Sequence, residues 1–328
     1  MSIQITKVNA QVTIQDTGRL NFQSSGVPVS GPMDEMAMIQ ANLLAGNKRH
    51  DACLEVGMGF LEMIIDKGTL ISICGDGHQV FINEAFVSHN RPIFFQEECR
   101  VKLKPGPGLW SYVAIGSGIN CPEILGSKST YLQSAFGGLE GRALKAGDKI
   151  KSYETASPQM LAIIKSLKLI NSDYATGNWF VGKNYNGDAL IRVMPGPEWN
   201  WLSKIQQEKI LSQPFIITND SSRMGYRLGG KPISHQIKDE LISSGVTKGT
   251  IQLTNDGSLI VLMADSQTVG GYPRIAQVSV VDIPKLSQQK PGAEIRFDLI
   301  SHEEGERLFL EYHLDLKKLE TGIRLKVL

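Results

Sequence analysis

Residues 60–74 read FLEMIIDKGTLISIC, in which two short apolar runs are separated by Asp66-Lys67-Gly68. Short runs rich in isoleucine, leucine and phenylalanine that end at turn-forming residues are typical of β-strands. We therefore predict strands at Phe60–Asp66 and Thr69–Cys74. Asn83-Glu84-Ala85 is expected to close a hairpin. Further predicted strands between Leu54 and Gly116 are Gln79–Asn83, Phe86–Ser88, Arg100–Lys104 and Trp110–Ala114.

The second half of the chain repeats this pattern. Asn255-Asp256-Gly257 predicts a hairpin turn there. At the N-terminus, Ile3–Ile14 alternates well enough to predict one strand. Helical spacing and end signals predict three helices, at Pro32–Leu44, Ser157–Leu169 and Glu303–Leu319. The predicted strands of the second half are Ile191–Met194, Phe215–Thr218, Thr250–Leu253, Leu259–Ala264, Gln277–Val281 and Glu294–Leu299.

The predicted fold class is mostly β with a few helices. A parallel sheet needs a crossover connection between neighbouring strands, and the sequence lacks helices between most of them. We therefore expect two related β-rich barrels rather than a doubly wound sheet. The length of 328 residues suits two domains. The polar, glycine-bearing segment Asn171–Asp188 predicts the boundary, with an N-terminal domain at 1–188 and a C-terminal domain at 189–328.

The charge balance excludes several function classes. The formal net charge is +1, and no long run of Lys and Arg occurs. We expect no nucleic-acid partner and no attraction to an anionic membrane. Met1–Ala10 lacks the pattern of a signal peptide, and apolar stretches such as Leu259–Ala264 are too short to span a bilayer. The sequence predicts a cytoplasmic protein.

Metal and nucleotide motifs are missing from the sequence. The four cysteines have no CxxC pairing, which predicts free thiols rather than disulfides or a zinc site. His302-Glu303-Glu304 resembles the start of HExxH, but Glu306 stands where the second histidine would be. No GxxxxGK[ST], GxSxG or GxGxxG motif is found. We expect no cofactor in this chain, and any ATP would be bound by another chain.

Two glycine-rich polar clusters in the first half are candidate binding sites. The first leads from Gln15–Arg19 through Gly26–Asp34 into a helix N-terminus, which favours an anion, although Ser30 or Gly31 could simply cap the helix. The second surrounds Gly126–Thr130 and Gly137–Arg142, which could equally be a surface loop. The candidate substrate-binding residues in these clusters are Arg19, Ser30, Met33, Asp34, Ser127, Ser129, Thr130 and Arg142.

Two further clusters lie in the second half. Ser221–Arg227 places two arginines and a tyrosine together, as in an anion site or in an ordinary solvated strand. Ala264–Arg274 follows an apolar strand with a costly loop, which makes it the strongest functional candidate of the four. The candidate substrate-binding residues are Arg223, Tyr226, Arg227, Gln267, Thr268, Gly270, Gly271 and Tyr272, and Asp265 is a candidate catalytic residue.

Taken in order, these clusters resemble the KipA family, also described as allophanate hydrolase subunit 2 or the 5-oxoprolinase C-subunit. The resemblance extends from about residue 13 to residue 300. The matching stretches are Gln15–Arg19, Gly26–Asp34, Ala41–Asn47, Leu54-Glu55, Leu125–Thr130, Gly137–Leu144, Gly147-Asp148, Arg223–Leu228, Gly249–Gln252 and Asp265–Pro273.

The resemblance implies a cyclophilin-like β-barrel architecture and two partner chains. One partner would be similar to KipI, the B-subunit of 5-oxoprolinase, and the other to the LamB/YcsF-like chain, its A-subunit. Together such chains open 5-oxoproline to glutamate with ATP. In urea carboxylase, the related region transfers a carboxyl group from carboxybiotin to urea. ATP or biotin would therefore reach this enzyme only through partner chains.

The chain departs from the family pattern at five positions, two of them (Ser117 and Asn120) in one segment. Lys128 replaces the arginine of GSRST, and Ser222 replaces the aspartate of SDRMGYR. Ser266 replaces the arginine of DRQTxGGYP, and Asn120 ends the segment that usually reads GGID. Losing an arginine removes bidentate carboxylate binding. Either the substrate differs, or this copy binds without turnover.

The leading hypothesis is therefore one subunit of an enzyme that acts on a small carboxylate or a cyclic amide such as 5-oxoproline. Backbone N–H groups of Ser30–Met33 or of Gly270-Gly271 would polarise the amide carbonyl. Arg223 or Arg227 would hold the carboxylate, and Asp265 or Glu55 would transfer protons.

Two alternatives stay open beside this hypothesis. One is a biotin-dependent carboxyltransferase, which would need a carrier domain that this chain lacks. The other is a KipA-like regulator that binds a KipI-like chain. In each case we expect Ser30–Asp34, Gly126–Thr130, Arg223–Arg227 and Asp265–Pro273 to converge on one cleft.

Overall fold

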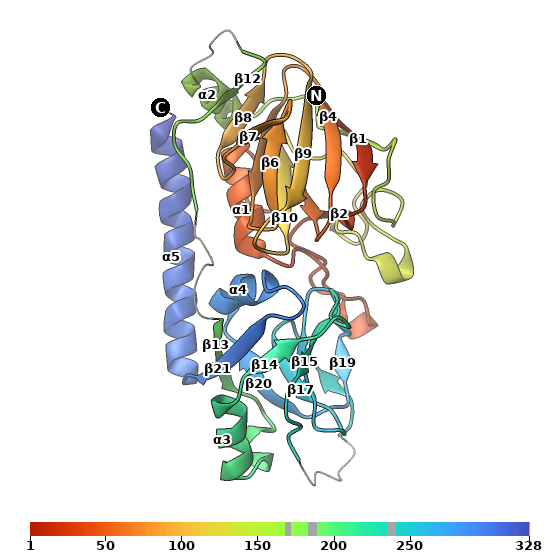
Figure 1. Ribbon diagram of the computed structural model, residues 1–328, viewed down its shortest axis with the longest axis vertical. Coiled ribbons are helices and arrows are strands. Elements are labelled where there is room, and N and C mark those ends of the chain that lie inside the picture. The colour runs from red at the N-terminus through yellow and green to blue at the C-terminus, as the bar shows by residue number, and fades with distance from the viewer. Residues whose placement is uncertain (168–171, 183–188, 235–240, 328) are drawn as a thin grey trace. The chain divides into compact units, whose positions relative to one another are not determined.

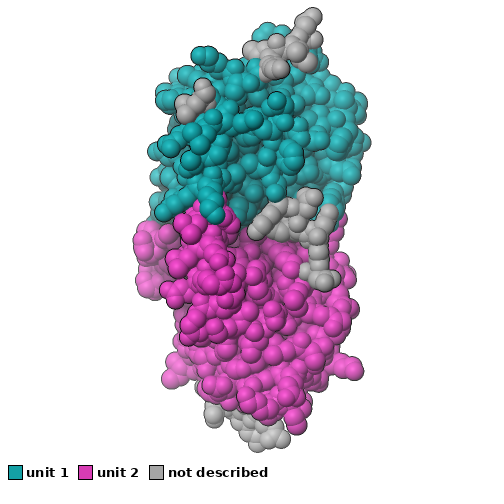
Figure 2. Space-filling view, turned by 90° about the vertical axis from the view of Figure 1, so that its left-hand side faces the viewer, with its two compact units in different colours: residues 1–19, 30–185, 316–328 teal, residues 20–29, 186–315 magenta. Residues whose placement is uncertain are grey.

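The computed structural model describes residues 1–167, 172–182, 189–234 and 241–327. The chain forms two compact units, coloured separately in Figure 2. Unit 1 comprises Met1–Arg19, Ser30–Tyr185 and Leu316–Leu328, and unit 2 comprises Leu20–Val29 and Asn186–Asp315. The chain therefore leaves unit 1 after Arg19 and re-enters it at Ser30. The predicted domain boundary at residue 188 lies outside the described residues and stays a prediction.

Unit 1 contains two six-stranded antiparallel sheets (Figure 1). The first has the order β11 (Lys149–Lys151), β1 (Ser2–Val8), β4 (Leu61–Ile65), β9 (Cys99–Pro105), β6 (His78–Ile82) and β7 (Ala85–Val87). The second has the order β12 (Tyr174–Thr176), β8 (Pro92–Phe95), β5 (Leu70–Cys74), β10 (Ser111–Ile115), β3 (Cys53–Val56) and β2 (Val12–Gln15). The two runs of residues 60–74 are strands, as predicted, and they belong to different sheets.

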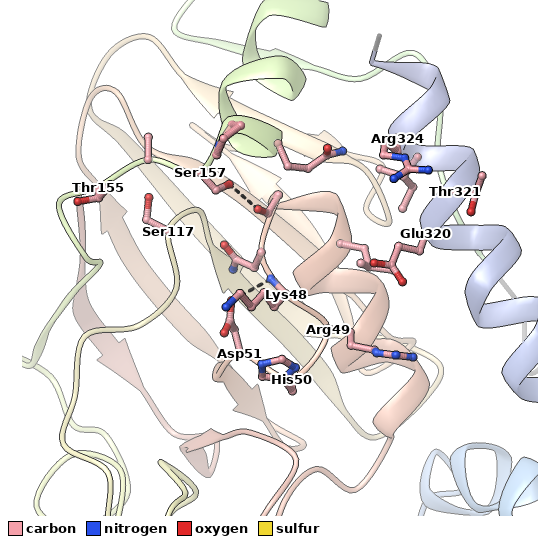
Figure 3. Close-up of a pocket in the computed structure, with 17 residues that line it drawn as sticks. Lys48, Arg49, His50, Asp51, Ser117, Thr155, Ser157, Glu320, Thr321 and Arg324 are labelled. Atoms are coloured by element: carbon pink, nitrogen blue, oxygen red, sulfur yellow. Dashed lines mark hydrogen bonds between the residues drawn. The ribbon is translucent and has the colours of Figure 1, made fainter.

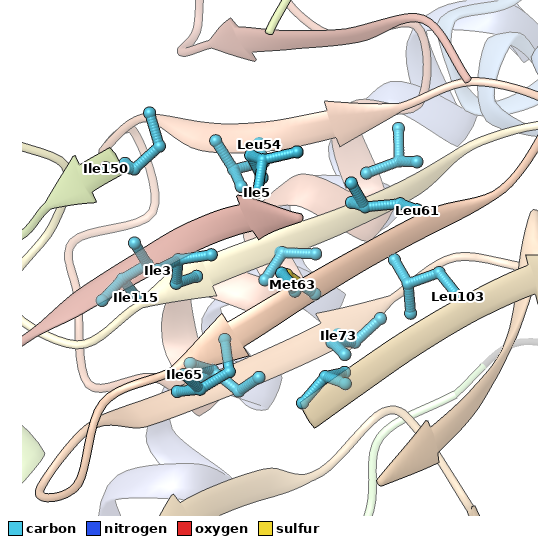
Figure 4. Close-up of a cluster of buried hydrophobic side chains, with 14 of the residues drawn as sticks. Ile3, Ile5, Leu54, Leu61, Met63, Ile65, Ile73, Leu103, Ile115 and Ile150 are labelled. Carbon is cyan, nitrogen blue, oxygen red and sulfur yellow. The ribbon is translucent and has the colours of Figure 1, made fainter. Parts of the chain in front are cut away.

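One hydrophobic core is shared by the two sheets. Ile5 and Met63 come from the first sheet, and Leu54, Ile73 and Ile115 come from the second (Figure 4). All five side chains are fully buried. Burial of an aliphatic side chain of this size stabilises a fold by about 1.5–3 kcal/mol. This core therefore supplies much of the stability of unit 1.

The N-terminal strand prediction was wrong in one respect. Residues Ile3–Ile14 form two strands, β1 and β2, which belong to different sheets. Between them the N–H groups of Asn9 and Ala10 donate to the carbonyl oxygen of Phe60. These bonds turn the chain from one sheet to the other, and such long-range pairing leaves no sign in the local alternation of residues.

Helix α1 (Glu35–Leu44) packs on β3, β5 and β10 of the second sheet. Its predicted start at Pro32 was three residues too early, because Asp34 is the N-cap and its carboxylate accepts from the Ala37 N–H at 3.0 Å. The N–H groups of Met33 and Asp34 donate to side chains of the sheet instead. The predicted end at Leu44 is confirmed, and Gly46 follows with φ +75°.

Four other α-helices lie in the described part of the chain. Helix α2 (Pro158–Ser166) begins one residue after the predicted start, Ser157, which is its N-cap, and the predicted end at Leu169 lies outside the described residues. Helix α5 (His302–Lys326) extends beyond the predicted end at Leu319. Helices α3 (Lys204–Ser212) and α4 (Ile283–Ser287) were not predicted. Short 3-10 turns are η1 (Gln23–Ser25), η2 (Leu132–Ser134), η3 (Trp199–Trp201) and η4 (Val280–Asp282). None of the helices within the described ranges has both the length and the apolar composition that a membrane crossing requires.

Unit 2 is built around a closed seven-stranded barrel. Its order is β13 (Leu190–Pro195), β20 (Arg274–Val278), β17 (Thr250–Leu253), β18 (Leu259–Leu262), β15 (Gly225–Gly229), β14 (Phe215–Ile217) and β21 (Glu294–Leu299). The parallel pairing of β13 with β21 closes it. Strands β16 (Ser244–Gly245) and β19 (Val269–Gly270) form a separate ribbon. The predicted mostly-β class is confirmed, as are the hairpins at Asn83–Ala85 and Asn255–Gly257.

Gly46 is required by space as well as by backbone conformation. A Cβ atom there would lie 2.6 Å from the Met160 backbone, whereas one at Gly68, with a similar φ of +78°, would meet nothing within 4 Å. We predict that Gly68→Ala lowers the free energy of unfolding by about 1 kcal/mol. Gly46→Ala should lower it by about 1–3 kcal/mol more, because α2 must shift. Urea denaturation measures both; equal losses would contradict this packing.

Candidate functional site

The outer face of the second sheet in unit 1 carries a row of polar side chains. Thr13 of β2, Glu55 of β3 and Tyr112 of β10 are paired directly across the three strands. Directly opposed residues point to the same face of a sheet, and so does Gln15, two residues after Thr13. All four are at most 1% exposed. This polar row lies on the face opposite the hydrophobic core.

Glu55 binds the chain just before α1. Its Oε2 accepts from the Met33 N–H at 2.8 Å and from the Tyr112 hydroxyl at 2.7 Å. The Tyr112 oxygen in turn accepts from the Asp34 N–H at 2.8 Å. Burial, and then the charge of Glu55, raise the pKa of the Tyr112 phenol well above its usual range, which keeps it a donor. The Met33 N–H, which belongs to the turn predicted to polarise the substrate carbonyl, is therefore already hydrogen-bonded within the protein. The same holds for the N–H of Asp34, the N-cap of α1.

Asp16 holds the second predicted loop. Its carboxylate accepts from the Lys128 N–H at 2.6 Å, from the Ser129 hydroxyl at 2.7 Å and from the Ser127 hydroxyl. Thr130 donates its hydroxyl to the Ile14 carbonyl at 3.1 Å. The hydroxyls of Ser127, Ser129 and Thr130, which were predicted to bind substrate, thus bind residues at the end of β2 and just after it.

Two residues singled out for their charge are also built into this loop. The Arg19 side chain is fully buried, donates to the carbonyl oxygens of Ile124 and Ser129, and stacks 4.6 Å from the centre of the Phe136 ring. The Lys128 ammonium donates to the Ile119 carbonyl at 3.0 Å and to the Tyr153 hydroxyl at 2.9 Å.

Arg142 directs its guanidinium fork at another residue of this chain. It donates to both Asp148 oxygens, at 2.7 and 3.0 Å. This pairing lowers the pKa of the Asp148 carboxyl. That Arg142 binds a substrate carboxylate stays a prediction, and such binding would require the Arg142–Asp148 pair to open.

Two polar atoms beside these loops have no hydrogen-bond partner among the described residues. They are Gln15 Oε1 and Ser30 Oγ, on side chains that are 0% and 5% exposed. Ser30 also has φ +57°, in the left-handed region that serine rarely adopts. A Cβ on the adjacent Gly31 would lie 3.2 Å from the Asp16 carbonyl, so this turn packs against the Asp16 backbone. A buried unpaired polar atom costs about 1–3 kcal/mol.

In unit 2, Arg223 and Asp265 form a buried ion pair. Arg223 Nε and Nη2 donate to the two Asp265 oxygens at 2.7 and 3.0 Å, and the Asp265 N–H donates to the Arg223 carbonyl at 2.8 Å. The side chains are 5% and 7% exposed. The candidate carboxylate binder and the candidate proton carrier therefore bind one another.

The remaining candidates of unit 2 differ in exposure. Tyr226 is buried in the barrel, where its hydroxyl donates to the Ser287 carbonyl at 2.8 Å. Arg227 and Tyr272 are exposed and line a cavity of about 460 Å³ together with Asp220 and Asp256. Ser266, where the family has arginine, is 8% exposed.

The Gly270-Gly271 loop of unit 2 packs on Gln252, which was not among the candidate site residues. The Gln252 side chain is 1% exposed, and its Nε2 has no partner among the described residues. A Cβ on Gly270 would lie 2.5 Å from this nitrogen. Gln267 and Thr268 are at least partly exposed, as is Gly271.

The four predicted segments are joined in pairs. The Ser30–Asp34 turn and Gly126–Thr130 both pack against Asp16–Thr17 in unit 1, and Arg223 binds Asp265 in unit 2. Convergence of the two pairs on one cleft stays a prediction.

Three residues of these networks were not predicted as individual candidates, namely Asp16, Tyr112 and Gln252. For Tyr112 and Gln252 the signal available was a polar residue within an otherwise apolar strand, as in SYVAI and TIQL. Such a residue is buried with the strand and needs a hydrogen-bond partner there.

Comparisons with known proteins agree with the resemblance seen in the motifs. The family described as carboxyltransferase domain, subdomain A and B, matches residues 25–299. The 5-oxoprolinase C-subunit of Escherichia coli is 34% identical over 304 residues, which cover 92% of each chain. Urea amidolyase of Saccharomyces cerevisiae is 28% identical over 339 residues, which cover 99% of this chain and 18% of the yeast protein.

The crystal structure of Kluyveromyces lactis urea carboxylase has the same fold. It superimposes with a TM-score of 0.84 at 24% identity, covering 98% of this chain and 29% of that chain. This chain thus spans less than a third of the urea carboxylase chain. The family match over residues 25–299 and the 34% identity confirm the predicted resemblance. The chain belongs to the carboxyltransferase domain (subdomain A and B) family and is a homologue of the 5-oxoprolinase C-subunit.

Proposed function

We propose that this chain is one subunit of an enzyme resembling 5-oxoprolinase, in which it contributes to binding the cyclic amide. Partner chains similar to the A- and B-type components of 5-oxoprolinase would bind ATP and complete the enzyme. The lactam C–N bond of 5-oxoproline would be opened by water to give glutamate, coupled to ATP hydrolysis by the complex.

The distribution of similarity supports this proposal. The identity to the Escherichia coli protein is higher than that to the yeast urea amidolyase, 34% against 28%. The matched region is 92% of the bacterial protein and 18% of urea amidolyase. Biotin-dependent carboxyl transfer is the second candidate, favoured by the TM-score of 0.84 to urea carboxylase. In that case a separate carrier would supply the biotin.

The observation that carries the proposal is the pair of unpartnered atoms in unit 1. Gln15 Oε1 can only accept a hydrogen bond, and Ser30 Oγ can donate one. A cyclic amide offers the matching groups, one N–H and one carbonyl oxygen. Both atoms are shielded from solvent, so the Ser30–Gly31 turn has to open for a ligand to reach them. Its left-handed backbone stores strain that such opening releases.

Glu55 and Tyr112 then have a positioning role. The Glu55 carboxylate holds Met33 and Tyr112, and Tyr112 holds Asp34, so the turn is attached at its α1 end. If Glu55 also transfers protons, as the sequence predicts, it would do so in addition to positioning the turn. Asp265 is similarly committed to Arg223, and its proposed function is to fix the loop that follows it.

Reconstitution with the partner chains tests the proposed function. The complete complex should hydrolyse ATP only when 5-oxoproline is present, and it should release glutamate. Omitting this chain should abolish both signals. Full activity from the partners alone would overturn the proposal, as would carboxylation of urea once a biotin carrier is added. Stable binding of a KipI-like chain with no turnover would instead identify a regulator.

Ser30→Ala separates a ligand-binding hydroxyl from a structural one. We predict a free energy of unfolding that is unchanged or raised by about 1 kcal/mol, because an unpaired buried hydroxyl is removed. The KM for 5-oxoproline should rise about tenfold, since one hydrogen bond to the substrate is lost. The matched control is Ser129→Ala, which removes a bond to Asp16 and should lower stability by about 1 kcal/mol. A destabilised Ser30→Ala variant with normal KM would refute this role.

The Arg223–Asp265 pair can be tested by comparing single and double variants. Asp265→Asn removes the carboxylate charge that pairs with the buried Arg223 guanidinium and should destabilise the protein by about 3–5 kcal/mol. Arg223→Met combined with Asp265→Leu removes both charges and should restore most of that stability. If Asp265 fixes the loop, the double variant should retain 5-oxoproline turnover. A stable but inactive double variant would show that Arg223 or Asp265 acts on the substrate directly, as their sequence context predicts.

A further inference from the structure

A cavity in unit 1 is lined by residues outside the glycine-rich clusters. It has a volume of about 950 Å³ and belongs entirely to unit 1. Its wall combines the loop after α1, the start of α2 and the last turns of α5 (Figure 3). None of the candidate residues from those clusters lines it.

Local contacts fix the shape of this cavity. The Ser157 hydroxyl donates to the Gly46 carbonyl at 2.7 Å and caps α2 by accepting from the Met160 N–H at 3.0 Å. The loop after α1 is closed by Asp51, whose carboxylate accepts from the Lys48 N–H at 2.9 Å. On α5, Ile323 is 4% exposed and anchors the helix to unit 1. The walls are therefore packed and hydrogen-bonded before any ligand arrives.

The lining has an excess of basic side chains. Lys48, Arg49 and Arg324 are exposed, and none makes an ion pair or a side-chain hydrogen bond within the described ranges. His50 adds a further nitrogen donor. The acidic lining residues are Asp51, committed to the Lys48 N–H, and Glu320.

Neutral polar groups complete the lining. The hydroxyl-bearing residues Ser117, Thr155 and Thr321 line the cavity and come from three different segments, which are labelled in Figure 3. Asn47 also lines the cavity, and its buried side-chain oxygen has no partner among the described residues. Such neutral donors and acceptors suit the polar body of a small metabolite as well as its charged group.

We propose that this cavity binds a small organic or inorganic anion through Lys48, Arg49 and Arg324, by means of carboxylate or phosphate oxygens. Cavities of roughly 300–1,000 Å³ are the size that holds small molecules. Arginine pairs with both kinds of oxyanion through its planar fork, and lysine adds a point charge. The site is separate from the loops assigned to the cyclic amide, so it does not rest on the proposed function.

Calorimetry on the full chain, with citrate as the carboxylate probe and pyrophosphate as the phosphate probe, tests the site. At least one probe should bind saturably, and the tighter one identifies the preferred oxyanion. Arg49→Gln and Arg324→Gln should each weaken binding about tenfold, because each removes one charge-assisted contact. Their melting temperatures should not change, since both side chains are exposed.

Arg296→Gln is the matched control, because Arg296 is an exposed arginine of unit 2 that pairs with Glu294. It should leave binding unaltered. The proposal is overturned if neither probe binds up to about 10 mM, or if the control weakens binding as much as the cavity variants. It is also overturned if the cavity variants lose a partner chain while no probe binds, because the basic residues would then dock an acidic protein surface.

Discussion

The buried carboxylate of Glu55 is the interaction on which the arrangement of unit 1 depends. A charge removed from water is tolerated only when it is hydrogen-bonded, and Glu55 is 0% exposed. It meets this requirement by accepting from Met33 and Tyr112, residues that belong to different segments of the chain. The start of α1, the second sheet and the Ser30–Gly31 turn are thereby fixed to one another. The fold and the candidate site share this one network.

The sequence was sufficient for features that depend on neighbouring residues. Alternation and turn residues located most strands and both hairpins, and helical spacing with its end signals located the end of α1. Features set by distant residues were not accessible. The division of Ile3–Ile14 between two sheets depends on a carbonyl at Phe60, and the late start of α1 depends on Glu55 and Tyr112. Short α4 carries too little periodicity to be recognised.

The sequence predicted which segments form the candidate site, but it did not predict what each residue in them does. The motifs identified the loops, but Ser129 binds Asp16, Arg142 binds Asp148 and Arg223 binds Asp265. Polar residues in glycine-rich loops serve either the loop or a ligand, and the sequence cannot distinguish the two uses. Ser30 differs from its neighbours because its hydroxyl is buried without a partner among the described residues. That property exists only in three dimensions.

The central claim is that Ser30 and Gln15 receive the cyclic amide. A crystal structure of the reconstituted complex with 5-oxoproline bound tests it most directly. We predict Ser30 Oγ and Gln15 Oε1 within about 2.7–3.2 Å of the lactam carbonyl oxygen and nitrogen, with the Glu55–Tyr112 contacts intact. A ligand bound elsewhere, with the Ser30 hydroxyl still enclosed by protein, would contradict it.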